Sequence, residues 1–213
     1  MNEGQSDRGI QDIQTLVRYY LRAVILPGDI VVDATAGRGK DTLFLARCVG
    51  ASGRVFSFDI QDEAILSTRE LLKEYGLSAR VELVNTCHSE MAKYIPIEKI
   101  KAIVFNLGYL PGSESKVATQ AQTTVKALTE ALKLLKETGV MVITVYRGHD
   151  GALEESEAIT NFLSRLPKKE FSVLQGIYLN QGEQSPYWLM IQKNRGKTNE
   201  SPPAKKNSGT DNQ

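Results

Sequence analysis

The chain has 213 residues, of which 41% are hydrophobic and 24% are charged, and its formal net charge at pH 7 is +1. A chain of this length and composition is typical of a single globular domain that buries one sizeable core. No run of 18 apolar residues occurs, which excludes a membrane-spanning helix, and the polar first nine residues do not resemble a signal peptide. So small a net charge does not indicate a nucleic-acid partner, and such a contact would depend on a local basic patch.

The two cysteines, Cys48 and Cys87, form neither a metal-binding pattern nor a disulfide framework. We therefore expect no bound metal and a reducing, cytoplasmic compartment. We expect residues 10–193 to form the domain, with a flexible segment at residues 1–9 and a disordered tail at residues 194–213, where no apolar run occurs.

The first predicted helix spans residues 10–25, where apolar side chains recur at helical spacing before Pro27 and Gly28. We expect this helix to cover an edge of a sheet or the mouth of a ligand site. Arg18 and Arg22 lie one turn apart on it and could touch phosphate, although a solvated face is the ordinary role of such residues.

Residues 30–32 form a β-branched run, Ile-Val-Val, that predicts a short buried strand ending at Asp33. Gly37 and Gly39 then allow the backbone to turn tightly and to approach a ligand closely. A helical apolar pattern follows at residues 42–46, with an acidic residue in its first turn. This order of strand, glycine loop and helix presents unpaired N–H groups and a partial positive charge to a ligand over the loop.

Two classes of cofactor bind to loops of this kind. The dinucleotide fingerprint Gly-x-Gly-x-x-Gly needs a third glycine, and Thr42 occupies that position when the count starts at Gly37. The loop that binds S-adenosylmethionine usually has an acidic residue at the strand end and then glycines, which Asp33, Gly37 and Gly39 match, while Thr35 replaces the first glycine. The pattern therefore favours S-adenosylmethionine over NAD. An ordinary strand-to-helix turn is the other interpretation.

The second predicted strand, residues 54–58, ends at Asp59, about 20 residues beyond the glycine loop. A carboxylate at that place can accept both ribose hydroxyls of an adenosine. Both classes of cofactor contain this ribose, so Asp59 indicates a bound nucleoside without separating the two. A helix over residues 62–75, closed by Gly76, and a strand over residues 81–84 follow.

The loop after the third strand contains His88 and Ser89. In folds that bind a methyl donor this loop lies against the adenine, so His88 could hydrogen-bond to the base or stack on it, and Ser89 could cap a short helix. A histidine on the surface of the loop, without a ligand, is the alternative interpretation.

The remaining elements alternate in the same way: a buried strand at 100–106, a helix at 117–135, a strand at 139–146, a helix at 152–166, and closing strands at 171–178 and 187–192. Strands that alternate with helices predict an α/β fold with a mostly parallel, seven-stranded sheet and helices on both faces. Ligands of such sheets bind beyond the carboxyl ends of the strands. Five polar residues fall at those ends: Asp33, Asp59, His88, Asn106 and His149.

Methyl transfer from a sulfonium is an in-line displacement, to which an enzyme contributes mainly by positioning. Methylation of a pyrimidine carbon commonly uses a cysteine nucleophile, and the candidate, Cys87, is expected beside the adenine rather than beside the methyl group. An amine acceptor needs hydrogen-bond acceptors and an aromatic wall. The segment from Asn106 to Tyr109 resembles the Asn-Pro-Pro-Tyr box of amino-methylating enzymes, with Leu107 and Gly108 in place of the prolines. Asn106 could orient the amine and Tyr109 could stack on the base, the alternative being a turn in which Tyr109 is simply packed.

Five parts of the sequence together resemble the MnmM family, also known as YtqB-like proteins or rRNA methylases: residues 33–46, residues 58–61, His88, residues 106–112, and the Gly-His-x-Gly-x-x-Glu pattern at residues 148–154. The resemblance extends over residues 10–193 and implies a Rossmann-like class I methyltransferase that uses S-adenosylmethionine. Members of the family methylate the exocyclic aminomethyl group on the wobble 2-thiouridine of certain tRNAs. The resemblance therefore implies the anticodon stem-loop of tRNA as the partner, in agreement with an amine acceptor.

The site residues that we predict fall into two groups. For the acceptor we predict catalytic roles for Asn106, Tyr109 and His149, because a histidine ordinarily titrates near neutrality and can take a proton from an amine. The predicted cofactor contacts are Asp33, Gly37, Arg38, Gly39, Lys40, Asp41, Asp59, Gln61, His88 and Ser89, with Arg38 where the family usually has Asn. The resemblance, together with an N-terminal helix that has apolar residues to spare, also predicts a homodimer.

Other functions share parts of this pattern. A methyltransferase that acts on rRNA or on a small metabolite would share the cofactor half and differ in the acceptor loops, residues 106–112 and 147–154. A nicotinamide oxidoreductase would need the glycine that Thr42 replaces. A non-catalytic module that binds the cofactor or RNA would not need Asn106 and Tyr109.

Overall fold

The structure is a computed structural model that describes residues 12–95, 99–110 and 117–196. The predicted flexible segment at residues 1–9 and nearly all of the predicted tail at residues 194–213 lie outside these ranges. Within them, no helix is both long enough and apolar enough to cross a membrane.

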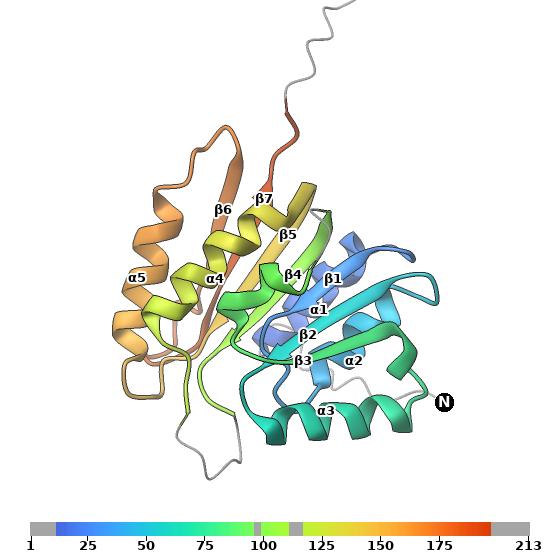
Figure 1. The fold of residues 1–213 in the computed structure, drawn as a ribbon. Helices are drawn as coiled ribbons and strands as arrows, with labels where there is room; N and C mark the ends of the chain where they lie inside the picture. Colours follow the sequence, from blue (N-terminus) through green and yellow to red (C-terminus); the bar gives the residue numbers. More distant parts are fainter. Residues whose placement is uncertain (1–11, 96–98, 111–116, 197–213) are drawn as a thin grey trace, which may run out of the picture.

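Helices and strands alternate along the described chain (Figure 1). In chain order they are α1 (Ile13–Val24), β1 (Ile30–Asp33), α2 (Lys40–Cys48), β2 (Arg54–Asp59), α3 (Asp62–Glu74), η2 (Ser78–Arg80), β3 (Val81–Asn85), η3 (His88–Lys93), β4 (Ile100–Leu107), α4 (Ala121–Leu134), β5 (Leu135–Val145), α5 (Ala152–Ser164), β6 (Phe171–Gly176) and β7 (Tyr187–Lys193). Each helix and strand that periodicity predicts is therefore present, with differences at some of the ends.

The strands form one seven-stranded sheet in the order β3-β2-β1-β4-β5-β7-β6. The pairs from β3 to β5 are parallel, whereas β7 runs antiparallel to both β5 and β6. The prediction of a mostly parallel, seven-stranded α/β sheet is confirmed. The strand order changes direction between β1 and β4, and ligands of doubly wound sheets bind at such a switch point.

Apolar side chains cover both faces of the sheet, because successive residues of a strand point to opposite faces. Phe105 of β4 joins Leu128 of α4 in a cluster that also includes residues of α5 and η3. Its neighbour Val104 joins Leu45 of α2 in a second cluster, with residues of α1 and α3. The core thus has two layers, one on each side of the sheet, and the predicted helices on both faces are confirmed.

The start of α4 differs from the prediction. The pattern predicted a helix from residue 117, but α4 begins at Ala121. The preceding residues are extended instead, since Ala118 forms an isolated antiparallel bridge with Tyr109. Local helix and strand propensities could not predict this bridge, because the bridge joins residues at the two ends of the loop after β4.

The start of β5 also differs, at Leu135 rather than at residue 139. Its register against β4 shifts between Ile100 and Ala102, so the first residues of β5 form an irregular part of the strand. A Cβ at residue 139 would lie 2.7 Å from the carbonyl oxygen of Lys136, which explains the glycine there. Because this irregular stretch contains polar residues, apolar alternation in the sequence did not predict the start of the strand.

The carboxyl ends of the parallel strands meet along one edge of the sheet, which we call the rim. Asp59 is in register with Asn85, and Asn106 is in register with Thr144 on the neighbouring strand. The loop that contains His149 leaves the same end of β5. The predicted placement of five polar residues at this edge is therefore confirmed, for Asp33, Asp59, His88, Asn106 and His149.

Candidate active site

The glycine loop between β1 and α2 makes the tight turn predicted for it. Gly37 and Gly39 have positive φ angles of 54° and 78°, which favour glycine. A Cβ at Gly39 would also lie 2.9 Å from the Cα of Thr68, so the close packing of the loop on α3 requires glycine there. Gly39 is the N-cap of α2, and the first unpaired N–H groups of this helix therefore lie at the rim.

The carboxylate of Asp59 lies at the end of β2, where two backbone amides hold it. The N–H of Gly37 donates to Oδ2 and the N–H of Gln61 donates to Oδ1, each at 3.0 Å. These bonds orient the carboxylate beside the glycine loop and leave lone pairs on both oxygens, as two ribose hydroxyls require. Gln61 takes part through its backbone in this arrangement, which fits an adenosine at this end of the rim.

Asp33 lies beneath the glycine loop and has no exposed surface. The hydroxyl of Thr42 donates to its Oδ2 at 2.6 Å, and the N–H of Thr35 donates to its Oδ1 at 3.1 Å. Burial raises the pKa of Asp33 to about 7, the charge of Asp41 adds to this, and the hydrogen bond from Thr42 opposes it. Thr42, which in the sequence only replaced a glycine, is therefore the residue that holds this buried carboxyl group.

Three further predicted contacts from the loop have different surroundings. Arg38 forms an ion pair of 2.7 Å with Glu63 on α3. Lys40, the first residue of α2, is exposed. The carboxylate of Asp41 is engaged within the chain, because it accepts two hydrogen bonds from the guanidinium of Arg18, at 2.6 and 3.0 Å.

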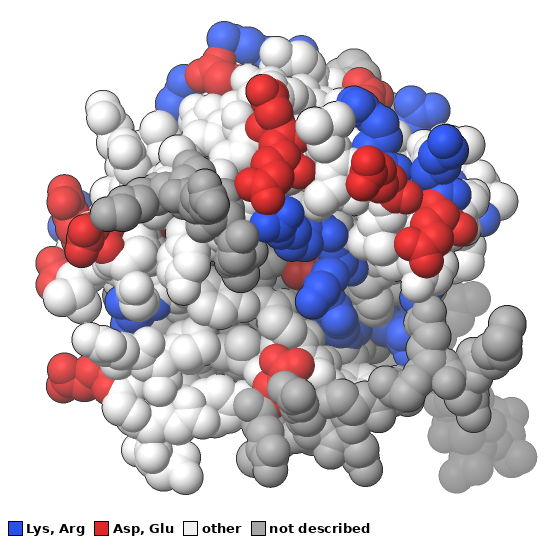
Figure 2. All heavy atoms as spheres, turned by 90° about the horizontal axis from the view of Figure 1, so that it is seen from below, with Lys and Arg blue, Asp and Glu red and all other residues white. Residues whose placement is uncertain are grey.

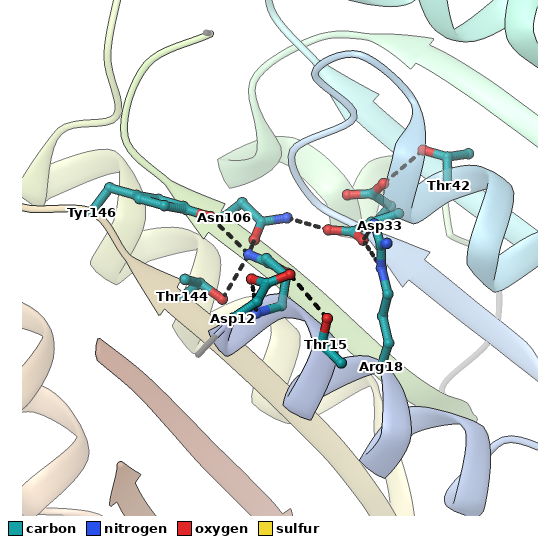
Figure 3. A network of polar contacts seen from close by, with 10 residues as sticks. Asp12, Thr15, Arg18, Asp33, Thr42, Asn106, Thr144 and Tyr146 are labelled. Carbon is teal, nitrogen blue, oxygen red and sulfur yellow. Dashed lines mark hydrogen bonds and ion pairs between the residues drawn. The ribbon is translucent and has the colours of Figure 1, made fainter. Parts of the chain in front are cut away.

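A polar network ties α1 to the rim at Asn106, the predicted acceptor-orienting residue (Figure 3). Its Oδ1 accepts a hydrogen bond of 2.7 Å from the amide of Gln14, and its Nδ2 donates to Asp41 at 2.8 Å. The same amide nitrogen of Gln14 also lies 2.9 Å from the hydroxyl of Tyr146 and 3.3 Å from that of Thr144. The amide group of Asn106 is therefore fixed in one orientation, with an Oδ1 lone pair left for a ligand.

His88 and Ser89 lie in η3 and are both buried. The ring of His88 packs edge-on against Phe105, with 5.8 Å between ring centroids, and hydrogen-bonds to the backbone of Ala34, while its Nε2 has no partner in the described chain. Burial lowers the pKa of His88 to about 4, so the ring is neutral at pH 7. The surface position is therefore wrong for His88. The cap predicted at Ser89 is also wrong, because Cys87 is the N-cap of η3 and the Ser89 hydroxyl donates to its Sγ.

Tyr109 and His149 come together at the other end of the rim. Their rings meet edge-to-face with 6.4 Å between centroids, and the ring of Tyr109 is half-exposed. The side chain of His149 is only 7% exposed, and its Nε2 lies 3.8 Å from Oε2 of Glu155. The Gly-His-x-Gly-x-x-Glu pattern ends at Glu154, which is exposed, so the buried neighbour Glu155 was not found from the sequence.

The rim face is basic near its middle. Figure 2, which looks at the molecule from below the view of Figure 1, shows Lys and Arg side chains across the centre of this face. Four basic residues lie on α1, in the glycine loop and at the start of α2: Arg18, Arg22, Arg38 and Lys40. Arg22 is exposed, with its guanidinium 5.8 Å from the ring centroid of Phe44. Because Arg18 pairs with Asp41 and Arg38 pairs with Glu63, the exposed cations of this basic patch are Arg22 and Lys40.

The strand order, the glycine loop after β1 and the carboxylate at the end of β2 are together those of a class I methyltransferase fold. The chain belongs to the family described as "Putative rRNA methylase", whose model matches residues 55–192. The family resemblance found in the sequence is thereby confirmed.

Three relatives show how far the similarity extends. The chain is 40% identical over 167 residues to "tRNA (mnm(5)s(2)U34)-methyltransferase, chloroplastic" of Arabidopsis thaliana, over 74% of this chain and 61% of that protein. A solved structure from Clostridium thermocellum, with the same description as the family, is 40% identical, with a TM-score of 0.82, over 84% of this chain and 96% of that one. A "putative methyltransferase" from Streptococcus mutans, solved in complex with SAH, is 34% identical, with a TM-score of 0.77, over 85% and 98%. The chain thus spans less than two thirds of the plant protein.

Proposed function

We propose that this protein uses S-adenosylmethionine to methylate the amine of 5-aminomethyl-2-thiouridine at the wobble position of tRNA. The observation that carries the proposal is that the glycine loop and Asp59 lie at the same rim as Asn106, Tyr109 and His149. In the proposal the first group binds the nucleoside of the cofactor and the second binds the acceptor. The plant relative named for this reaction is 40% identical. A cytoplasmic location and a homodimeric assembly belong to the same proposal.

The cofactor half of the proposal rests on the residues that surround the glycine loop. Asp59 is already oriented by two amides and would accept the ribose hydroxyls, while the N-terminus of α2 presents its N–H groups at the same place. The relative from Streptococcus mutans contains SAH, the demethylated product of this cofactor. When bound, S-adenosylmethionine supplies an electrophilic methyl group on a sulfonium.

The acceptor half would work by positioning and by removing one proton. An alkylamine is mostly protonated at neutral pH, as lysine is, so it must lose a proton before its lone pair can react. His149 would take that proton, and Oδ1 of Asn106 would accept a hydrogen bond from an N–H group of the amine. The half-exposed ring of Tyr109 would stack on the base. The N–C bond then forms as the C–S bond breaks with its electron pair on sulfur, which gives a methylated ammonium.

The basic patch favours a nucleic-acid acceptor over a small metabolite. Exposed Lys and Arg side chains on the rim face can neutralise backbone phosphates on either side of a base that enters the site. A small metabolite would make no use of basic residues outside the site. RNA is therefore the acceptor class that we test.

Calorimetry with SAH and with NAD tests the cofactor half. We expect micromolar binding of SAH and none of NAD. Asp59→Ala should weaken SAH binding about 10- to 100-fold, because loss of a hydrogen bond to a charged group costs roughly 1.5–3 kcal/mol. Asp62→Ala, which removes an exposed carboxylate at the start of α3, is the matched control and should bind normally. Tight binding of NAD, or an unaffected Asp59→Ala, would contradict this assignment.

Methyl incorporation into two tRNAs tests the acceptor. We expect labelling of tRNA that carries unmethylated 5-aminomethyl-2-thiouridine and none of the same tRNA without that group. Asn106→Ala and Tyr109→Ala should lower turnover at least tenfold with SAH affinity nearly intact, whereas Tyr109→Phe, which keeps the ring, should remain active. Equal labelling of both tRNAs would exclude this acceptor, and unchanged rates in both alanine variants would remove these residues from the mechanism.

A further inference from the structure

Glu155 is a buried carboxylate in the first turn of α5, directly behind His149. The residue is only 1% exposed. The hydroxyl of Thr119 donates to its Oε2 at 2.7 Å, and the hydroxyl of Thr124 on α4 donates to its Oε1 at 2.6 Å. Both oxygens therefore act as hydrogen-bond acceptors, and the N-terminus of α5 adds a partial positive charge beside them.

Burying this carboxylate is costly, because two hydroxyls replace only part of the water that it loses. Among the described residues, His149 is the basic side chain beside Glu155, with its Nε2 3.8 Å from Oε2. Neither ring nitrogen of His149 has a hydrogen-bond partner there, although the ring is nine-tenths buried. The pair is thus incomplete while the histidine is neutral, and it becomes a full ion pair when the histidine is protonated.

The other ionisable groups around His149 do not compete for this role. Tyr109 offers the edge-to-face contact of its ring. Asp150, the next residue along the chain, is exposed. Arg147 points elsewhere, because it donates to the carbonyl oxygen of Glu183 at 2.7 Å and lies over the ring of Tyr187. The charge that bears on His149 from the core side is therefore that of Glu155.

We propose that Glu155 is the positioning residue that makes His149 a base, with Thr119 and Thr124 holding the carboxylate in place. This inference rests on the proposed amine methylation and names the group that drives its proton transfer. In this proposal the tautomer with a proton on Nε2 faces the carboxylate, since Nε2 lies 3.8 Å from Oε2 of Glu155, and Nδ1 takes the proton once the acceptor ammonium reaches this buried atom. The imidazolium that results is stabilised by the carboxylate, and it returns its proton to water after the product leaves.

Nuclear magnetic resonance of the histidine rings tests this pair without any substrate. The chain has only two histidines, so ring-labelled protein gives two sets of signals, and His149→Gln assigns them. Glu155→Gln keeps the shape and the hydrogen-bonding capacity of the side chain but removes its charge. We expect the His149 signals to change at a lower pH in Glu155→Gln than in the wild type, because the imidazolium loses its neighbouring anion.

Glu154→Gln is the matched control, since it removes the exposed carboxylate of the preceding residue in the same helix. Its His149 signals should change at the wild-type pH. Thermal unfolding of each variant checks that the fold is retained, and Thr124→Val, which removes one donor to the carboxylate, should give a smaller change in the same direction as Glu155→Gln.

Turnover measurements connect the pair to the reaction. With saturating tRNA, Glu155→Gln should lower kcat at pH 7.5 about 10- to 100-fold and move the acidic limb of the pH profile to lower pH, with SAH affinity unchanged. Identical titration of His149 in Glu155→Gln and in the wild type would overturn the proposal, as would an unmoved acidic limb. A coupled pair in a protein that methylates neither tRNA would instead support the pair and refute the amine acceptor.

Discussion

The acidic residue at the end of β1 combines full burial with a carboxyl group that titrates near neutrality. The loop pattern in the sequence predicted an acid at this position. Its burial could not be predicted, because Thr42 and Ser57, which close over Asp33, come from α2 and β2. The two hydroxyls lie 2.9 Å apart and form one buried polar cluster with the carboxyl group. A buried group of this kind should make the stability of the fold depend on pH.

For Asp33 the sign follows from its two pKa values. The pKa rises from an ordinary 3.8 to about 7 in the folded protein, so between these values the folded chain holds a proton that the unfolded chain has released. Stability therefore falls as pH rises through this window, by at most roughly 4 kcal/mol, and stays constant above it. Asp33→Asn should be more stable than the wild type at pH 8, and urea unfolding should show this advantage shrinking toward pH 4.

Asp62→Asn provides the control, because it removes an exposed carboxylate that has little effect on stability. Its difference from the wild type should stay small at every pH. If the advantage of Asp33→Asn were the same at pH 4 and pH 8, the folded protein would not hold the extra proton, and the assignment of a raised pKa would fail.

His88 and Glu155 mark two places where residue types alone could not give the environment. The loop position of His88 predicted either a ligand contact or a surface side chain, and the structure excludes only the second, because the ring is buried against Phe105. Glu154 and Glu155 look alike in the sequence, yet successive residues of a helix point about 100° apart. Only the packing of α5 against α4 shows that Glu155 is the inward one, where it meets Thr124.

At the scale of single elements, α1 holds more of the site than its pattern indicated. The apolar spacing correctly predicted a helix with Ile13, Val17 and Leu21 on its buried side. Its polar side looked solvated, but Gln14 bonds to Asn106, 92 residues away in the chain, and Arg18 bonds to Asp41. Such long-range polar contacts leave no periodic signal, which is why the site was predicted without Gln14.

Removing the amide of Gln14 should loosen α1 and disturb Asn106 together. We expect Gln14→Ala to raise hydrogen exchange of the α1 backbone amides roughly fivefold, because a buried hydrogen bond contributes about 1 kcal/mol. Amides of α3 should exchange as in the wild type. Turnover should also fall, with SAH affinity retained, since Asn106 loses the donor that fixes its Oδ1.

Tyr19→Ala is the control for this effect, because Tyr19 is an exposed side chain on the same helix. It should leave both exchange and turnover near wild-type values. Unchanged α1 exchange in Gln14→Ala would show that apolar packing alone holds the helix, and the network in Figure 3 would then have no part in its stability.

For the whole molecule, alternation of strands and helices was enough to predict a parallel α/β sheet, and so the rim. The exact strand order could not be predicted, because no local sequence pattern indicates that β7 lies between β5 and β6. The homodimer was predicted partly from spare apolar residues on the first helix. The structure removes that reason, since Ile13, Val17 and Leu21 are buried in the chain's own core.

A different surface now supports a dimer. Strand β6 forms one edge of the described sheet and pairs only with β7. Four apolar side chains on β6 and the turn after it are exposed, Val173, Leu174, Ile177 and Leu179, the last of them 91% exposed. An open strand edge with exposed apolar side chains on it and beside it is typical of a surface that pairs with another chain.

We therefore expect a homodimer that forms through the β6 edge of each copy, by a two-fold axis that brings the same patch together. Light scattering should give about 47 kDa, twice the chain mass of 23.6 kDa, at micromolar concentrations. Leu174→Glu combined with Leu179→Glu should weaken dimerisation at least tenfold, because both charges would be buried without partners. Leu66→Glu, at an exposed leucine on α3, should not. A wild-type mass of 23.6 kDa across this concentration range would exclude the dimer, and a dimer that survives the double substitution would place its interface elsewhere.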